Sequence, residues 1–223
     1  PSIGVVRSQE AAEQVKDLVT QGMRLFVADL SDPEAINVLA SRLSSENCTP
    51  TVLILNAGLM TDDCVDGLQA EQLKKVLATN LAGPLLLLSR LLPVLKANQG
   101  RVIAISSLSA RMATDQGRVA YPASKAGLSM AFSALRLQSD LAPVRFVTVE
   151  AGRMTPQPRL LAVTYDWAAS RILDMVGNPD PPAVAVFPFS ARVVFGMLRM
   201  LPVAAVRWIA DRRRHLNPPN GRA

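Results

Sequence analysis

The chain has 223 residues, 49% of them hydrophobic, which is enough for one well-buried domain. Its formal net charge is +6, but residues 191–223 hold seven arginines against the single acid Asp211, so the first 190 residues are neutral. Because that body has no basic stretch interleaved with aromatic residues, we expect no nucleic-acid partner.

The two cysteines, Cys48 and Cys64, lie in ordinary segments without the paired spacing of a metal site. With no secretory leader in the sequence, this pattern predicts no disulfide framework, no bound metal and a reducing, cytoplasmic compartment. The one histidine, His215, lies in the basic tail, where we expect it to be exposed and not catalytic.

Six apolar runs alternate with longer helical segments along the chain. The runs read IGVV, RLFVADL, TVLILNAG, RVIAISS, RFVTVEAG and AVAVF. They lack polar alternation, as burial on both faces of a parallel sheet requires. The alternation predicts an α/β fold with an open, doubly wound parallel sheet between two layers of helices, whose ligand crevice lies beyond the carboxyl ends of the strands.

The segments between these runs predict helices over 8–22, 32–43, 69–98 and 122–143. We place one domain over 1–190. Residues 191–223 are expected to form two amphipathic helices, split near Pro202, and a basic tail, and we treat them as part of the same domain. Arg192, Arg199 and Arg207 interrupt the apolar run there, so it should not span a bilayer. These helices could cover a substrate cleft, pack against a partner or lie on a membrane surface.

Several separated motifs together resemble the short-chain dehydrogenase/reductase family over nearly the whole chain. They are NAG at 56–58 after a buried strand, TNLAGP around Asn80, ISS at 105–107, and Tyr121 four residues before Lys125, fourteen residues beyond Ser107. A further match is ADLSD at 28–32. The resemblance implies a Rossmann-like, three-layer fold and an enzyme that uses a nicotinamide cofactor.

By the resemblance, the catalytic residues are Asn80, Ser107, Tyr121 and Lys125. A helix places Tyr121 and Lys125 on one face, where the ammonium and an oxidised nicotinamide would lower the tyrosine pKa from about 10. Tyr121 would then exchange a proton with a substrate oxygen that Ser107 steadies, while Asn80 holds a water on the proton path. The spacing leaves Ser109 as an alternative to Ser107.

The resemblance also implies a set of residues that bind the cofactor. Asp29 falls where the family places a residue against the adenine ring, and Lys125 would hold the nicotinamide ribose. The full expected set is Arg7, Ser8, Asp29, Leu30, Asn56, Ala57, Gly58, Asn80, Tyr121, Lys125, Ala151, Gly152 and Thr155.

Cofactor preference depends on the residue after the strand that reaches the adenine ribose, where an acid would repel a 2′-phosphate. The segment VVRS offers no acid there. Arg7, with Ser8, could pair with that phosphate, so we expect NADP(H) to be preferred over NAD(H). The alternative is that Arg7 is an ordinary surface arginine.

The family's glycine-rich turn between its first strand and first helix is absent from this sequence. The segment PSIGVVRS aligns with the second strand, so we expect a sheet that lacks its first strand and helix, a unit of roughly 30 residues. We interpret the chain as a fragment of a longer enzyme, which by itself should bind NADPH poorly. The alternative is a truncated, catalytically silent relative that serves as an interaction protein.

The substrate is expected to be a small carbonyl compound or alcohol of apolar, lipid-like or steroid-like character, because FPFSARVVFGMLRMLP brings apolar side chains near the family's substrate mouth. Such residues also form core or subunit contacts. The resemblance further implies a homo-oligomer, and the C-terminal helices suggest peripheral contact with a membrane. The segment from Arg153 to Tyr165 is expected to be a short lid.

Overall fold

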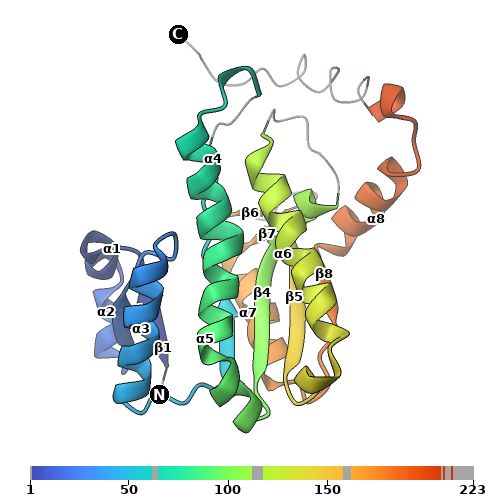
Figure 1. Cartoon of the computed structure of the whole chain (residues 1–223). Coiled ribbons are helices and arrows are strands. Elements are labelled where there is room, and N and C mark those ends of the chain that lie inside the picture. Colours follow the sequence, from blue (N-terminus) through green and yellow to red (C-terminus); the bar gives the residue numbers. More distant parts are fainter. Residues whose placement is uncertain are drawn as a thin grey trace.

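The computed structural model describes residues 2–61, 65–111, 118–157, 162–206, 208 and 212. Its strands alternate with helices, as the apolar runs predicted (Figure 1). The strands are β1 (Ile3–Val6), β2 (Arg24–Val27), β3 (Val52–Leu55), β4 (Arg101–Ser107), β5 (Arg145–Ala151), β6 (Arg153–Thr155), β7 (Ala162–Thr164) and β8 (Val184–Phe187).

The helices lie between these strands and vary in length. They are α1 (Gln9–Gln14), α2 (Lys16–Thr20), α3 (Pro33–Ser45), α4 (Ala70–Leu77), α5 (Gly83–Ala97), α6 (Ala120–Arg136), α7 (Tyr165–Gly177) and α8 (Phe189–Leu198), with a π-helical turn at Ala78–Ala82 and 3₁₀ turns at Val65–Gly67, Leu108–Ala110 and Ser139–Leu141.

The four strands β3, β4, β5 and β8 pair in parallel in that order, and two separate cores cover the two faces of this sheet. Val102 and Ala104 of β4 face a core shared with α3, α5 and α6. Ile103 and Ile105, whose side chains point the other way, pack in a core with α7. The doubly wound α/β fold with helices on both faces is therefore confirmed.

Among the described residues, β1 pairs only with β2, and β3 pairs only with β4. One edge of β1 and one edge of β3 are thus unpaired, and Figure 1 shows the β1–β2 unit set apart from the larger sheet. That the sheet lacks the family's first strand and helix stays a prediction. The unit still joins the main core, because Phe26 and Leu39 pack in the same cluster as Leu88 of α5.

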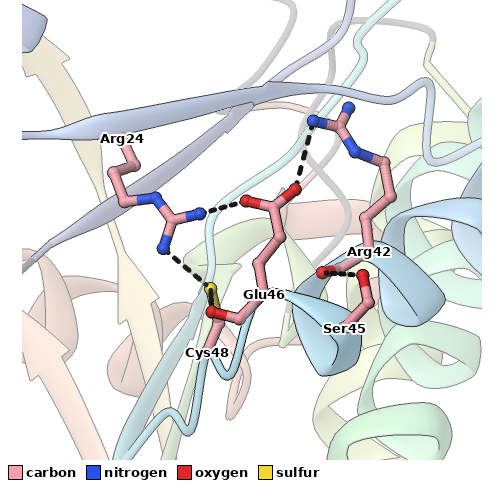
Figure 2. A network of polar contacts seen from close by, with 5 residues as sticks. All are labelled: Arg24, Arg42, Ser45, Glu46 and Cys48. Carbon is pink, nitrogen blue, oxygen red and sulfur yellow. Dashed lines mark hydrogen bonds and ion pairs between the residues drawn. The ribbon is translucent and has the colours of Figure 1, made fainter.

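A polar network fastens β2 to the end of α3 (Figure 2). Glu46 accepts from both Arg24 at the start of β2 and Arg42 in the last turn of α3. Arg24 also donates to the free thiol of Cys48, with 3.3 Å between Nη1 and Sγ. These half-exposed contacts lie away from the predicted site residues and serve to hold the small unit together.

Several expected boundaries need correction. The helix expected over 8–22 is two helices, because Val15 leaves the helical region (φ −120°, ψ 16°). The helix expected over 122–143 ends at Arg136, and a 3₁₀ turn follows it before Pro143, which cannot continue a helix. The expected lid contains the two short paired strands β6 and β7.

One helical stretch, Ala70–Ala97, is long and apolar enough to cross a membrane by length and composition alone. The core helix of a soluble protein satisfies the same criterion. Here Leu87, Leu88, Leu91 and Leu95 are buried in the main core. The apolar character of this stretch is therefore explained by its packing against the sheet.

Candidate active site

A cavity of about 270 Å³ lies at the carboxyl ends of β3, β4 and β5, where the sequence placed the ligand crevice. Side chains of β4, α6 and the segments that follow β3 and β5 meet there. The lining residues are Asn56, Gly58, Met60, Ile105, Ser106, Ser107, Tyr121, Lys125, Ala151, Gly152 and Met154. Seven of the predicted site residues are thus brought together in one cavity.

Ser107 and Tyr121 both line this cavity, and the Ser107 side chain lies close enough to Tyr121 to lower the pKa of the phenol. Ser107 Oγ also accepts from the amide of Ser109 at 3.1 Å and from the Ser109 hydroxyl at 2.8 Å. Because Ser107 Oγ accepts both bonds from Ser109, its own proton stays available for a further acceptor in the cavity. The neighbouring Ser106 instead is buried and bonds Ser129 and the backbone carbonyl of Lys125.

The pKa of Tyr121 is raised above its usual value of 10.0. Burial is the largest cause, and it outweighs the lowering effects of the Ser107 hydrogen bond and of the positive charge of Arg118. Sequence reasoning expected a lowered pKa with Lys125 as one cause. In this structure burial favours the neutral, proton-bearing form of the tyrosine.

Lys125 extends its ammonium group into the buried wall of the cavity. Nζ donates to the backbone carbonyl of Ile105 at 2.8 Å, and only 3% of the residue is exposed. Burial lowers the pKa of this lysine to about 8. A Cβ on Gly58 would come within 3.5 Å of Nζ, so Gly58 keeps one side of the ammonium open.

Asn80 lies at the centre of the π-helical turn and is fully buried. Its side chain accepts from the Leu59 amide at 2.6 Å, donates to the Leu59 carbonyl at 2.8 Å and donates to Ser124 Oγ at 3.0 Å. The amide group thereby ties the segment after β3 to the helix of Tyr121 and Lys125. A π-helical turn of this kind is frequent at functional sites.

The residues expected at the adenine end lie at the carboxyl ends of β1 and β2 and do not line the cavity. Asp29 accepts from the amide and the hydroxyl of Ser31, and its pKa is lowered by these bonds and by the charges of Lys75 and Arg7, although burial opposes this. Ser8 caps α1 by accepting from the Ala11 amide at 3.3 Å. Its side chain therefore already has a structural partner.

Three further predicted residues do not line the cavity: Leu30, Ala57 and Thr155. The Leu30 carbonyl packs directly on Gly83, where an added Cβ would come within 1.9 Å of the oxygen. Thr155 in β6 donates to the carbonyl of Gln157 at 2.6 Å. The predictions on Cys64 and His215 concern residues outside the described part of the chain.

The arrangement fits the nicotinamide end of a dinucleotide better than its middle. The cavity is close to the lower limit of about 300 Å³ for small-molecule sites, so it suits one end of such a cofactor. In the described part of the chain, the ammonium group of Lys125 donates one hydrogen bond, to the Ile105 carbonyl. Its other N–H groups are therefore available to the hydroxyls of a ribose. Within residues 2–61, no glycine-rich turn at a helix start is present to bind the pyrophosphate.

Sequence reasoning missed several contributors to the site. Leu59 and Ser124 hold Asn80, Met60 and Met154 line the cavity, and Arg118 acts on Tyr121 through its charge. Met60 and Met154 each follow a predicted strand by a few residues, which is a usable signal. The bonds of Asn80 join residues 21 and 44 positions apart, and no local pattern predicts them.

This fold and this site agree with the comparison of the sequence with known families. A sequence model of the short chain dehydrogenases matches residues 2–159, so the chain belongs to the short-chain dehydrogenase family. The family identified from the motifs is therefore confirmed.

Animal and bacterial proteins named as dehydrogenases, reductases or oxidoreductases are among the relatives. Dehydrogenase/reductase SDR family member 7B of Bos taurus is 31% identical over 169 residues, which are 75% of this chain and 52% of the relative. The uncharacterized oxidoreductase YgfF of Escherichia coli is 27% identical over 68% of this chain and 64% of its own length. The chain thus spans about half the length of the first of these relatives and less than two thirds of the second.

Solved structures support the same fold. A short-chain dehydrogenase from Streptomyces avermitilis aligns with a TM-score of 0.75 at 21% identity, covering 98% of this chain and 88% of that one. A metagenomic short-chain oxidoreductase in complex with NADP gives 0.72 at 24% identity, over 82% and 83%. A 4-hydroxyisoleucine dehydrogenase complexed with NADH and succinate gives 0.76 at 21% identity, over 86% and 88%.

Proposed function

We propose that this protein is an NADP(H)-dependent oxidoreductase that interconverts a carbonyl compound and a secondary alcohol. The observation that carries the proposal is that Ser107, Tyr121 and Lys125 line one cavity at the carboxyl ends of the parallel strands. A bound nicotinamide supplies or accepts the hydride in such a reaction. The residues of this chain have to orient the substrate oxygen and move its proton.

For reduction, the neutral Tyr121 donates its proton from Oη to the substrate oxygen. Its raised pKa favours this proton-bearing form, and Ser107 adds a second donor to the same oxygen. The positive charge of Lys125 then stabilises the tyrosinate. The negative charge of the tyrosinate in turn favours the charged form of the lysine. Because both N–H groups of Asn80 have protein partners, a water on the proton path would bond to the backbone carbonyls of the π-helical turn.

The preference for NADP(H) rests on Arg7. Its side chain is exposed at the carboxyl end of β1, near enough to Asp29 for its charge to lower the pKa of that carboxyl group. Arg7 and Asp29 therefore share the corner where an adenine ribose would lie. One structural neighbour binds NADP and another binds NADH, so the fold itself does not decide the preference.

Replacing Arg7 tests this preference in the protein at full length. Arg7→Ala should weaken NADPH binding at least about tenfold through loss of a charge-assisted contact while changing NADH binding less than twofold. Titration calorimetry with both cofactors measures this, and Lys16→Ala, an exposed cation on α2, is a control. Unchanged NADPH affinity would show that Arg7 is a surface arginine.

The proposed substrate is apolar. Met60, Ile105, Ala151 and Met154 give the cavity an apolar part beside Ser107 and Tyr121. NADPH consumption with a panel of aliphatic, aromatic and steroid-like ketones should exceed that with small sugars. A preference for polar sugars would contradict this part of the proposal.

We propose a cytoplasmic homo-oligomer, with α8 as a contact surface. Phe189, Val193 and Met197 recur at helical spacing on α8, and all three are exposed.

The unpaired thiol of Cys48 is consistent with a reducing compartment. The exposed Arg192 on α8 and Arg199 directly after it also suit peripheral contact with an anionic membrane.

A further inference from the structure

We propose that Glu150 is a positioning residue, which fixes the turn of Ser107 against β5 through an ion pair with Arg111. The role rests on the proposed function, because Ser107 matters only if Tyr121 transfers a proton beside it. Glu150 does not line the cavity, so it acts through other residues.

Glu150 is a buried carboxylate on the central strand β5. Only 5% of the residue is exposed, and it lies opposite Ser106 in the β4–β5 register. Arg111 Nε donates to its Oε2, with the arginine side chain 37% exposed and the glutamate side chain 7%. A buried charge is costly unless it is paired, so this contact determines where Arg111 lies.

Arg111 closes the turn that Ser107 begins. Ser107 accepts from the amide and the hydroxyl of Ser109, and the Arg111 amide donates to the Leu108 carbonyl at 3.0 Å. One end of the turn is thus the last residue of β4, and the other end is held on β5 by Glu150. Both anchors are strands, which restricts the directions in which the Ser107 hydroxyl can point.

The same face of β5 also holds the helix of Tyr121. Arg136, the last residue of α6, donates to Thr148 Oγ1 at 3.1 Å, two residues before Glu150. Burial lowers the pKa of Arg136, and the charge of Glu150 raises it. Glu150 therefore lies between two arginines, one from the serine turn and one from the tyrosine helix.

Helix α6 has a second attachment that does not involve Glu150. Ser106 Oγ lies 2.7 Å from Ser129 Oγ and donates to the Lys125 carbonyl at 3.0 Å. Loss of the Arg111–Glu150 pair should therefore loosen the serine turn and leave α6 in place. This separates a positioning role from a general contribution to stability.

The test is Arg111→Met in the protein at full length, which keeps an apolar stem and removes the guanidinium group. We expect the hydrogen-exchange rate of the Ser109 amide to be at least tenfold higher than in the unsubstituted protein. The exchange rate of the Ile103 amide in β4 should change less than twofold. The kcat should fall about 10- to 100-fold with little change in KM, since a misplaced donor costs rate and not binding. Arg111→Lys should restore part of both.

Arg101→Met is the matched control. Arg101 is a partly buried arginine at the opposite end of β4, where it donates to the carbonyls of Met175 and Val176. This variant should lower the melting temperature without a selective change at Ser109. If the two variants behave alike, or if Arg111→Met leaves both Ser109 exchange and kcat within twofold, the positioning role is wrong.

If Arg111→Met does not fold, Arg111→Met/Glu150→Leu replaces it, because that double variant leaves no unpaired buried carboxylate. The same selective change at Ser109 supports the proposal, and its absence overturns it. The exchange measurement needs no turnover. A protein without carbonyl reduction would therefore contradict the proposed function while the exchange data still decide the role of Glu150.

Discussion

Lys125 brings an ammonium group into the buried wall of the site, and this has a consequence for stability. Its pKa falls from 10.5 to about 8 on folding because burial disfavours the charged form. Between these two values the unfolded chain binds more protons than the folded chain, so the contribution of Lys125 to stability rises with pH. Below pH 8 the full penalty remains, on the order of 3 kcal/mol.

Lys125→Met should therefore be more stable than the natural chain at pH 7, by about 2 kcal/mol, with the difference decreasing toward pH 10. Thermal melts of both proteins at several pH values measure this. A difference that does not depend on pH would show that the buried charge is not its cause. The variant should also lose carbonyl reduction, so stability and activity change in opposite directions.

The residues of the site show how far sequence reasoning reaches. The spacing of Tyr121 and Lys125 and the position of Asn80 identify the family and place these residues at one edge of the sheet. The choice among Ser106, Ser107 and Ser109 depends on which way each hydroxyl points. Only the structure shows that Ser106 faces α6, whereas Ser107 faces Tyr121.

At the scale of the elements, the contact between Gly83 and Leu30 joins the β1–β2 unit to α5. A Cβ at position 83 would come within 1.9 Å of the Leu30 carbonyl oxygen and 2.9 Å of its carbon. Backbone atoms cannot rotate away as a side chain can. The turn that carries Asp29 therefore depends on a residue without a side chain at the start of α5.

Gly83→Ala should destabilise the protein by about 1–3 kcal/mol, because the overlap outweighs the gain of an alanine in a helix. Urea unfolding measures this loss. Gly196→Ala in α8 is the matched control, since its added Cβ meets nothing within 4 Å, and it should stabilise by up to about 1 kcal/mol. Equal effects of the two variants would contradict the close contact.

The long apolar runs predicted the main strands closely, and β1 and β4 have the bounds expected from the sequence. Short or composite elements were not predictable in the same way. The three-residue strands β6 and β7 depend on pairing with each other, and the π-helical turn lies within one continuous helical pattern. Local propensity is too weak to specify features of this size.

At the scale of the whole molecule, the described strands form two separate parallel units, β1–β2 and β3–β4–β5–β8. The residues expected at the adenine end lie on the smaller unit, and those proposed to transfer the proton lie on the larger one. A cofactor that contacts Arg7 and Lys125 together would bridge the two units. Cofactor binding should for this reason depend on how firmly the two units are held together.

The most direct test of the central claim is NADPH-dependent reduction of an apolar ketone by the protein at full length and by its Tyr121→Phe variant. The variant keeps the ring that lines the cavity and removes the hydroxyl group beside Ser107. We predict measurable reduction by the natural protein and a loss of about 10²- to 10⁴-fold in kcat for the variant, with NADPH affinity within about threefold. Undiminished turnover in Tyr121→Phe, or no reduction of any carbonyl compound by the natural protein, would contradict the account.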